Sequence, residues 1–479
     1  MTETLTRSFF ELKFLTIMQR IDYFCIQDQK KKTMMRKKKS TLLALCGWLT
    51  VTVASAQTMT LGECIRMGIE RNLQLAEKRI DIQKGETQIR QSRAMLLPRV
   101  DGSLQVIDYL KDPVQVSNST LIDMDFPDEP QWGRVRTMQY TSQAMLKAQV
   151  PIYNQSIFAA INAAKVVKEL HTLAYEKAVE TLTVQIAKTY YAAQAFKEQR
   201  LLLDEDVKRM TELADIAKAM HSQGVILETD YTRISINITN LETMRKQYQM
   251  VYDQQLNTLR FLLDMEAEDA IDVERMDGGL IPAPSQGLSG ALPDQLLLDA
   301  QHTLTEKQIK LTRAGYLPSI GLFGQAGYMG YQEKFGDFFK KFNNRQFGMA
   351  AVGFQLNIPI FDASEKRLKV RQYKYDAEKN RTNRQLLDAS LQKDYTNATL
   401  QLSQNEQIFT TQSQNRQQAQ RVYDLTTRRY KEGVASMTEL LQDDMRLISS
   451  EQDMVNAHLQ YNLALIDFLR LENNLGALK

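Results

Sequence analysis

Two stretches of this 479-residue chain contain neither glycine nor proline over a length that no compact domain can hold. They run from Asn154 to Gln223, 70 residues, and from Asp362 to Glu432, 71 residues. A continuous helix of that length would extend about 105 Å at 1.5 Å per residue. Each stretch ends at a glycine, Gly224 or Gly433, which readily takes the left-handed conformation at a helix C-terminus. We therefore predict two long helices that stop at these glycines.

A second helix is predicted to follow each glycine, so that each half of the chain forms a long helical hairpin. Candidate N-cap residues are Thr229 in the first hairpin and Ser436 in the second. The return helix of the second hairpin repeats apolar residues every seven positions in two adjacent columns: Leu440, Leu447, Met454, Tyr461 and Phe468, then Leu441, Ile448, Val455 and Leu469, with Asn462 as the polar exception. A heptad repeat predicts a coiled coil. Because two columns exceed what a two-stranded seam needs, we expect each helix to contact neighbours on both sides.

The plan of strands and helices occurs twice along the chain. Three pairs of matching segments show the repeat: "LLPRVDGSL" and "YLPSIGLFG", "QVPIYNQS" and "NIPIFDAS", "HSQGVILETDY" and "YKEGVASMTEL". We predict a first repeat over residues 57–276 with its hairpin tip at about 224. A second repeat over 294–479 has its tip at about 433, and a Gly- and Pro-rich linker over 277–293 separates the two.

Four segments alternate apolar and polar residues, as β-strands do. In "TMQYTSQAMLKAQVPIY", residues such as Tyr140, Leu146 and Val150 alternate with polar ones, and Met145 is the exception. The predicted strands cover about 99–110, 137–151, 319–330 and 346–360. Each is near the roughly 9 to 11 residues of a transmembrane strand. One apolar and one polar face suit a barrel with lipid outside and water inside. A soluble four-stranded sheet on a globular core is the alternative.

The third predicted strand is unusual because it has a glycine at every third position. These glycines are Gly321, Gly324, Gly327 and Gly330. We expect them to let the strand bend or to let side chains approach closely. The two strand pairs are joined by long segments, Lys111–Arg136 and Gln332–Arg345, which suit loops at the outer surface.

Four strands cannot close a membrane barrel by themselves. Open sheet edges in hydrocarbon leave backbone groups unpaired, at a cost of several kcal/mol each. Membrane barrels begin at about eight strands. The chain must therefore assemble with further copies of itself, and three copies would supply about 12 strands.

An export signal precedes the first repeat. Residues 34–56, "MMRKKKSTLLALCGWLTVTVASA", combine a basic start, an apolar stretch and a small-x-small ending. This pattern predicts a secretory signal peptide that is cleaved after Ala56. Residues 1–33 resemble no targeting element, so we expect translation to begin at Met34 or Met35.

Charge and composition argue against nucleic-acid binding and catalysis. Residues 57–479 hold 50 Lys or Arg and 53 Asp or Glu, a net charge of −3, whereas nucleic-acid binding needs a basic surface. Cys64 is the one cysteine left after cleavage, so no internal disulfide is expected. The four histidines are scattered, and no nucleophile, phosphate or dinucleotide fingerprint occurs. We therefore expect no catalytic, cofactor-binding or metal-binding residues, and we class the chain as a non-enzyme.

Several motifs together carry a family resemblance. They are "TLGECIRMGIERNLQL" from Thr60, the strand entries "RAMLLP" and "RAGYLP", the strand exits "PIY" and "PIF", and "RRYKEGVASMTELLQDDMRL" from Arg428. In this order they resemble the TolC family of outer-membrane efflux proteins, over nearly the whole mature chain. The resemblance implies a homotrimer in the outer membrane of a Gram-negative bacterium. Its fold would be mainly helical, with a 12-stranded β-barrel in lipid above a periplasmic α-barrel of helical hairpins.

The resemblance also implies a function. Such proteins are passive exit ducts of tripartite efflux or secretion systems, coupled to an inner-membrane pump through a periplasmic adaptor, and they need no cofactor. Their tunnel closes at the hairpin tips. The constriction and gate positions fall on Glu439, Gln442, Asp443, Tyr430, Thr229 and Asp230. The tips at which the adaptor docks are Gly224, Val225, Gly433 and Val434. Ala435 stands where the family has an arginine, so the implied lock is partial.

Two function classes stay open on the sequence alone. One is the export conduit, and the other is a periplasmic coiled-coil scaffold without channel activity. The acidic gate residues have a second explanation, because the helix dipole favours acids such as Glu439 and Asp443 in the first turn regardless of function. Within the conduit class, drugs, metal ions and proteins are all open as cargo.

Overall fold

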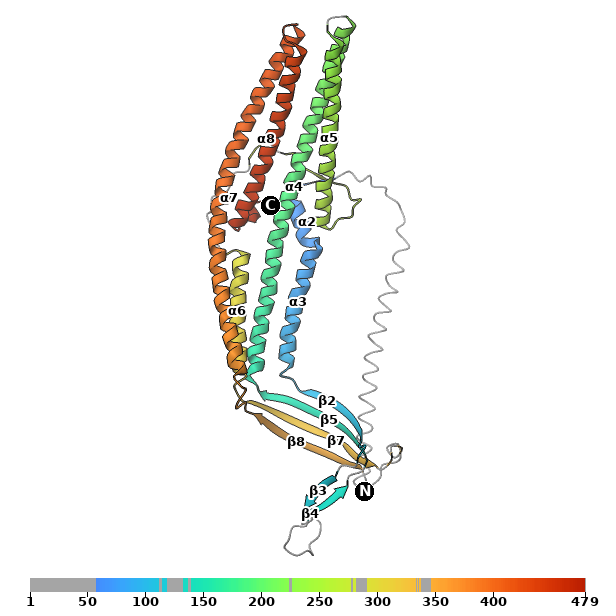
Figure 1. Cartoon of the computed structure of the whole chain (residues 1–479), viewed down its shortest axis with the longest axis vertical. Helices are drawn as coiled ribbons and strands as arrows, with labels where there is room; N and C mark the ends of the chain where they lie inside the picture. Colours follow the sequence, from blue (N-terminus) through green and yellow to red (C-terminus); the bar gives the residue numbers. More distant parts are fainter. Residues whose placement is uncertain are drawn as a thin grey trace. The chain divides into compact units, whose positions relative to one another are not determined.

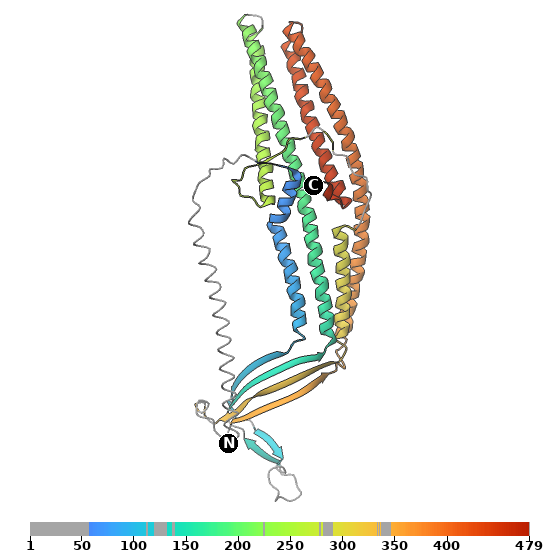
Figure 2. The ribbon, with the colours of Figure 1, turned by 180° about the vertical axis from the view of Figure 1, so that it is seen from behind.

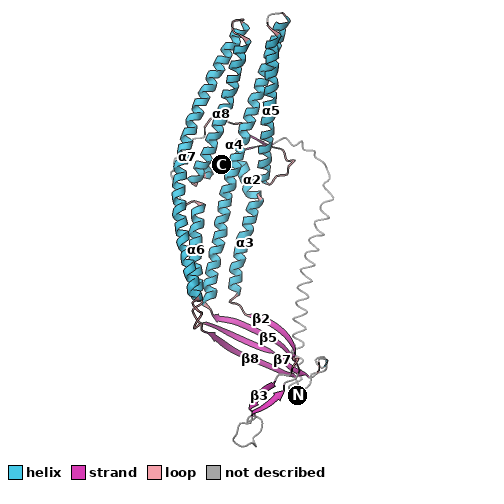
Figure 3. Cartoon of the chain, viewed as in Figure 1, coloured by secondary structure: helices cyan, strands magenta, loops and turns pink. Residues whose placement is uncertain are grey.

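The computed structural model describes residues 57–111, 114–118, 132–136, 139–223, 226–276, 279–280, 291–332, 334, 336 and 346–478 (Figures 1 and 3). The predicted signal peptide, Gly224, Val225 and most of the predicted linker lie outside these ranges. The described helices are α2 (Leu61–Arg71), α3 (Leu73–Ala94), α4 (Gln155–Ser222), α5 (Glu228–Leu263), α6 (Pro293–Ala314), α7 (Glu365–Lys431), α8 (Met437–Leu471) and the short η3 (Leu475–Leu478). The strands are β1 (Gln57–Met59), β2 (Arg99–Asp108), β3 (Val114–Asn118), β4 (Trp132–Arg136), β5 (Tyr140–Tyr153), β6 (Ile271–Val273), β7 (Ser319–Gln332) and β8 (Gln346–Asn357).

The two long helices predicted from the sequence are confirmed. Helix α4 has 68 residues and α7 has 67. The side chain of Asn154 caps the start of α4 by accepting a hydrogen bond from the backbone N–H of Ser156 at 3.0 Å. Helices α5 and α8 return along α4 and α7 and form the two hairpins, as Figure 1 shows. None of the described helices combines the length and the hydrophobicity needed to cross a bilayer.

Four helices lie side by side, and each is connected directly to one strand of the sheet. Helix α3 packs on α4, α4 on α6, and α6 on α7 (Figure 2). Along the chain α3 leads into β2, β5 into α4, α6 into β7, and β8 into α7. The four strands are hydrogen-bonded in the same order, β2-β5-β7-β8, and all neighbours are antiparallel. The sheet is not closed within one chain, so β2 and β8 are its two free edges.

The sheet has one apolar and one polar face, as the alternation predicts. The apolar face carries exposed side chains from all four strands: Val100, Leu104, Leu146, Leu322, Val352 and Phe354. Val352 and Phe354 are 82% and 79% exposed, which is unusual for large apolar side chains. The polar face carries Asp101, Gln105, Lys147, Gln149, Gln325 and Gln355. A face this apolar and this exposed indicates contact with lipid or with another protein.

Met145, the exception in the alternation, fills a hollow on the polar face. It pairs with Gly327 on the neighbouring strand and is only 3% exposed. A Cβ atom built on Gly327 would lie 2.6 Å from the sulfur of Met145 and 2.0 Å from the carbonyl oxygen of Ala144. Phe323 covers Gly353 in the same way, at 2.9 Å from a built Cβ. The interpretation of these glycines as sites of close side-chain approach is therefore supported at Gly327.

Two features of the fold were not predicted. The segment Lys111–Arg136 carries a short antiparallel hairpin, β3 with β4, where a loop was expected. A small two-stranded parallel sheet, β1 with β6, lies at the middle of the helices. It joins a core that includes Cys64, Ile65 and Tyr190, and the Tyr190 hydroxyl donates to the carbonyl of Met59 at 2.9 Å. Burial raises the pKa of the Cys64 thiol to about 12.

The Gly327 site yields a test of the sheet. We expect Gly327→Ala to destabilise the sheet by about 1 to 3 kcal/mol, because the added methyl group must displace backbone as well as Met145. Gly324→Ala is the matched control, since its Cβ would meet Val352 at an ordinary 3.8 Å. Thermal unfolding in detergent, followed by circular dichroism, should show a lower midpoint for the first variant only. Equal midpoints would contradict the packing described for Met145.

Candidate functional site

The tip of the second hairpin, between α7 and α8, is a compact turn closed by its own backbone. Gly433 has φ = 74°, in the left-handed region as predicted. Its N–H donates to the carbonyl of Tyr430 at 3.0 Å, and the N–H of Val434 donates to that of Arg429 at 2.8 Å. This is the Schellman pattern of helix termination. Ser436 then caps α8 by accepting from the N–H of Glu439 at 3.2 Å, which confirms its predicted N-cap role.

The tip of the first hairpin differs at the start of α5. The N-cap is Leu227, whose side chain makes no capping bond, so the prediction of Thr229 as N-cap is wrong. Helix α5 begins two residues earlier than expected, which places Thr229 inside the first turn, where it is exposed. Glu228 and Asp230 supply negative charge to that turn and interact favourably with the helix dipole.

The predicted acidic gate residues divide into two groups. Glu439 is 43% exposed and accepts a hydrogen bond from Arg429 of α7 at 3.3 Å, and Gln442 is exposed. Asp443 is instead buried inside its own hairpin. It accepts from the hydroxyl of Thr426 at 2.7 Å and from Arg446 at 3.1 Å. Of these three, Glu439 and Gln442 keep exposed polar side chains, and Glu439 is paired with Arg429 of the same hairpin.

Polar contacts also cross from one hairpin to the other. Tyr430 is 4% exposed, and its hydroxyl faces the sulfur of Met220 on α4 at 3.9 Å. Burial, and then the nearby carboxylate of Asp230, raise the pKa of Tyr430. Arg233 of α5 donates to the hydroxyl of Thr438 on α8 at 3.1 Å and to Asp230 at 3.4 Å. Arg233, which sequence reasoning missed, thus provides a direct polar link between the tips.

A buried charged cluster further from the tips was also missed. Arg209 of α4 forms ion pairs with Asp206 on its own helix and, at 3.3 Å, with Asp444 of α8. Its guanidinium lies over the ring of Tyr423 of α7, 5.0 Å from the centroid. Arg416 of α7 pairs with Glu451 of α8 at 3.4 Å. The cluster, defined as Asp206, Arg209, Arg416, Tyr423, Asp444 and Glu451, thereby joins the two hairpins.

This cluster holds three carboxylates against two guanidinium groups. Burial raises the pKa of Asp444 to about 7, and the carboxylate of Asp206 adds to the effect while Arg209 opposes it. Burial and Asp206 likewise raise the pKa of Glu451 to about 7. The second carboxylate oxygen of Asp444 and that of Glu451 are buried without a hydrogen-bond partner among the described residues, which penalises the ionised forms. The cluster is therefore poised to take up a proton near neutral pH.

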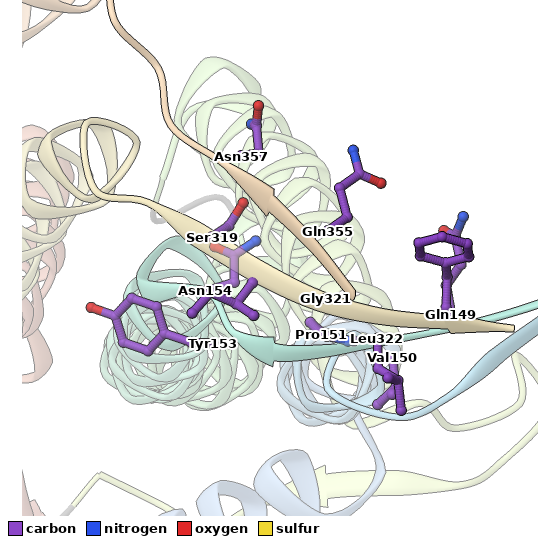
Figure 4. Close-up of a pocket in the computed structure, with 12 residues that line it drawn as sticks. Gln149, Val150, Pro151, Tyr153, Asn154, Ser319, Gly321, Leu322, Gln355 and Asn357 are labelled. Carbon is purple, nitrogen blue, oxygen red and sulfur yellow. The ribbon is translucent and has the colours of Figure 1, made fainter. Parts of the chain in front are cut away.

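A separate hollow of about 330 Å³ lies where the sheet meets the helices (Figure 4). Its polar lining residues are Gln149, Asn154, Ser319, Gln355 and Asn357. None of its lining residues is charged, so the hollow offers hydrogen bonds but does not favour a ligand of either charge. Elsewhere in the described ranges, no group of three or more His, Cys, Asp or Glu side chains is placed to hold a metal ion.

The open sheet and the long helical hairpins define a class of outer-membrane subunit, and comparison with known proteins agrees. The family model described as outer membrane efflux protein matches residues 65–264 and 294–475. The chain belongs to this outer membrane efflux protein family, which confirms the family resemblance seen in the sequence. Family membership places it in the outer membrane of a Gram-negative bacterium, with its helices in the periplasm.

Individual relatives are distant. A probable efflux pump outer membrane protein of Pseudomonas putida, TtgC, is 24% identical over 286 residues, which are 58% of this chain and 57% of the relative. The matched part thus spans little more than half of that curated protein. The solved Campylobacter jejuni CmeC outer membrane channel superposes with a TM-score of 0.68 at 16% identity, covering 89% of this chain and 91% of that chain. The Neisseria gonorrhoeae MtrE outer membrane channel gives 0.64 at 18% identity, covering 89% and 94%.

The buried cluster makes stability depend on pH in a defined direction. Because the folded-state pKa values of Asp444 and Glu451 are raised, their protons stabilise the folded chain at low pH, and this contribution is lost as pH rises towards 7. We expect the free energy of unfolding to fall between pH 5 and 7.5, by at most about 1.4 kcal/mol per pH unit for each proton released. Urea denaturation at several pH values measures this slope.

The matched variants are Asp444→Asn and Asp424→Asn. Asparagine has the shape of the protonated acid, so the first variant should flatten the pH slope and exceed the wild type in stability at pH 8. Asp424 lies on the exposed side of α7, where its substitution removes the same charge without touching the cluster. An unchanged slope in Asp444→Asn would show that this residue does not titrate as described.

Proposed function

We propose that this chain is the outer-membrane exit duct of a tripartite efflux or secretion system. It would act as a passive conduit from periplasm to exterior, coupled to an inner-membrane pump through a periplasmic adaptor. The observation that carries the proposal is the open four-stranded sheet with an exposed apolar face, joined strand by strand to two long and two shorter helices. The duct itself catalyses no reaction, and the pump supplies the energy.

The assembly that fits this sheet is a homotrimer. Edge strands β2 and β8 carry unpaired backbone groups that hydrocarbon does not tolerate. Joining β8 of one copy to β2 of the next satisfies both edges, and three copies give about 12 strands. The exposed apolar side chains of Val352 and Phe354 would then face lipid. The printed names of the relatives, an efflux pump outer membrane protein and outer membrane channels, agree with this role.

The hairpin tips would form the closed end and the adaptor-docking surface. Glu439 and Gln442 keep exposed polar side chains near the tip of the second hairpin, so three copies of each would ring the narrow end of the tunnel. Tyr430, Asp230 and Arg233 would hold the second hairpin against the first. Gly433 and the 66%-exposed Val434, with Gly224 and Val225 of the first tip, would meet the adaptor. Asp443 is held within its own hairpin by the hydroxyl of Thr426, so it would stabilise the tip without lining the tunnel. Thr229 would likewise support the gate from the first turn of α5.

The acidic ring can be tested by ion selectivity. Three copies of Glu439 around a narrow pore should attract cations, so we expect Glu439→Gln to reduce the cation preference of the reconstituted channel. The measurement is the reversal potential in a planar bilayer under a salt gradient. Asp453→Asn is the control, because it lies two heptads further along the same exposed face of α8. If both substitutions had equal effects, the narrow ring could not be at Glu439, and absence of any channel would refute the duct itself.

The link between hairpins can be tested by conductance. We expect Arg233→Ala to raise the conductance of the resting channel several-fold, because it removes the hydrogen bond to Thr438 that holds α8 against α5. Arg245→Ala is the matched control on the same helix, since Arg245 pairs at 3.3 Å with Asp204 inside its own hairpin. Single-channel recordings of both variants compare the two. A resting conductance that rose equally in both would indicate general loosening of α5 instead of a lock at the tips.

A further inference from the structure

The ends of the helices next to the sheet carry a local excess of positive charge. Residues 86–98, 155–168, 304–316 and 362–374 together hold twelve Lys or Arg and four Asp or Glu. Residues 57–479 as a whole have a net charge of −3, so this level of the molecule is much more basic than the chain average. These four segments meet at one level because each is the part of α3, α4, α6 or α7 that adjoins its strand.

Within this basic level, α4 and α6 enclose a groove of about 430 Å³. Lys307, Lys310 and Arg313 line it from α6, and Gln155 and Asn162 line it from α4. No carboxylate is among the lining residues. Lys310 and Arg313 are exposed, and none of the three cations forms an ion pair with another described residue. The backbone at the start of α4, beside Gln155, adds the positive end of a helix dipole.

The end of the groove towards the sheet is apolar. Leu317 lines that end and is 46% exposed. Three residues later Ile320 begins the exposed apolar row of β7, which continues with Leu322. At about 3.3 Å per residue, Leu317 therefore lies within about 10 Å of the lipid-facing surface. Headgroups occupy the outermost several ångströms of a bilayer, roughly 40–45 Å thick in total against about 30 Å of hydrocarbon.

We propose that the groove formed by Lys307, Lys310, Arg313, Gln155 and Asn162 binds the phosphate-bearing headgroup of an anionic phospholipid from the periplasmic leaflet. Arginine and lysine are well suited to phosphate oxygens, and the amides of Gln155 and Asn162 add neutral hydrogen bonds. Leu317 contacts the start of an acyl chain. A soluble anion in the tunnel would offer the same phosphate chemistry, and the experiment below separates the two sources. The proposal requires the sheet to lie in the membrane, and it holds independently of the gate at the tips.

The test compares lipids of opposite headgroup character. Native mass spectrometry of the detergent-solubilised protein, titrated with phosphatidylglycerol or phosphatidylcholine, gives the relative affinities. We expect the wild type to prefer phosphatidylglycerol by about tenfold, and the triple variant Lys307→Gln, Lys310→Gln, Arg313→Gln to lose that preference. High salt should weaken the preference in the wild type, because exposed charges are screened.

Three controls make the result decisive. Lys208→Gln, Lys218→Gln and Lys246→Gln together remove the same charge from exposed sites nearer the tips and should leave the preference intact. A charge-conserving triple, Lys307→Arg, Lys310→Arg, Arg313→Lys, should also retain it. Glycerol 3-phosphate at the same concentration should not displace the lipid.

Two outcomes would overturn the proposal. The first is a preference for phosphatidylglycerol over phosphatidylcholine that is equal in the glutamine triple variant and the wild type. The second is displacement of the lipid by glycerol 3-phosphate, which would show that the groove is a site for soluble anions. Planar-bilayer conductance of the same variants separates these outcomes from failure of the channel assignment, because loss of lipid preference alone leaves conductance intact.

Discussion

The unpaired backbone groups at the two sheet edges govern the rest of this structure. A strand in lipid must have every N–H and C=O bonded, because no water replaces a missing partner. The described residues of one chain supply β2-β5-β7-β8 to this sheet, so in the proposed trimer its outer strands are satisfied by other copies. Each strand of the sheet leads directly into or out of a long helix, so the order of the strands also sets the order of the helices beneath them. Assembly of the sheet therefore also builds the helical wall.

Much of this fold could be predicted because its signals are long and regular. The glycine- and proline-free stretches predicted α4 and α7, and the heptad columns predicted the buried face of α8, where Leu440, Leu447 and Val455 are all buried. Period-two alternation predicted the two faces of the sheet. Gly433 was predicted as a left-handed terminator because few other residues tolerate that conformation. Each of these predictions depends on backbone geometry or on a repeated pattern.

The details of the candidate site depended on contacts between distant segments, which a single sequence does not display. Asp444 and Glu451 stand seven residues apart beside the apolar columns, and His458 continues their row, so a buried polar column was visible in principle. Their partners Arg209 and Arg416 lie on other helices and carried no signal. Thr229 was misplaced because Leu227 begins α5 without a capping side chain. The fold was thus accessible from the sequence, while the links between hairpins were not.

Each long helix runs beside two shorter ones that meet near its middle: α3 and α5 along α4, and α6 and α8 along α7. These junctions are packed, because one hydrophobic core with residues from α2, α4, α5, α7 and α8 lies at this level. The core around Tyr190, with β1, β6 and α2, lies at the joint on α4. The same core therefore braces the two hairpins against each other between the tips and the sheet.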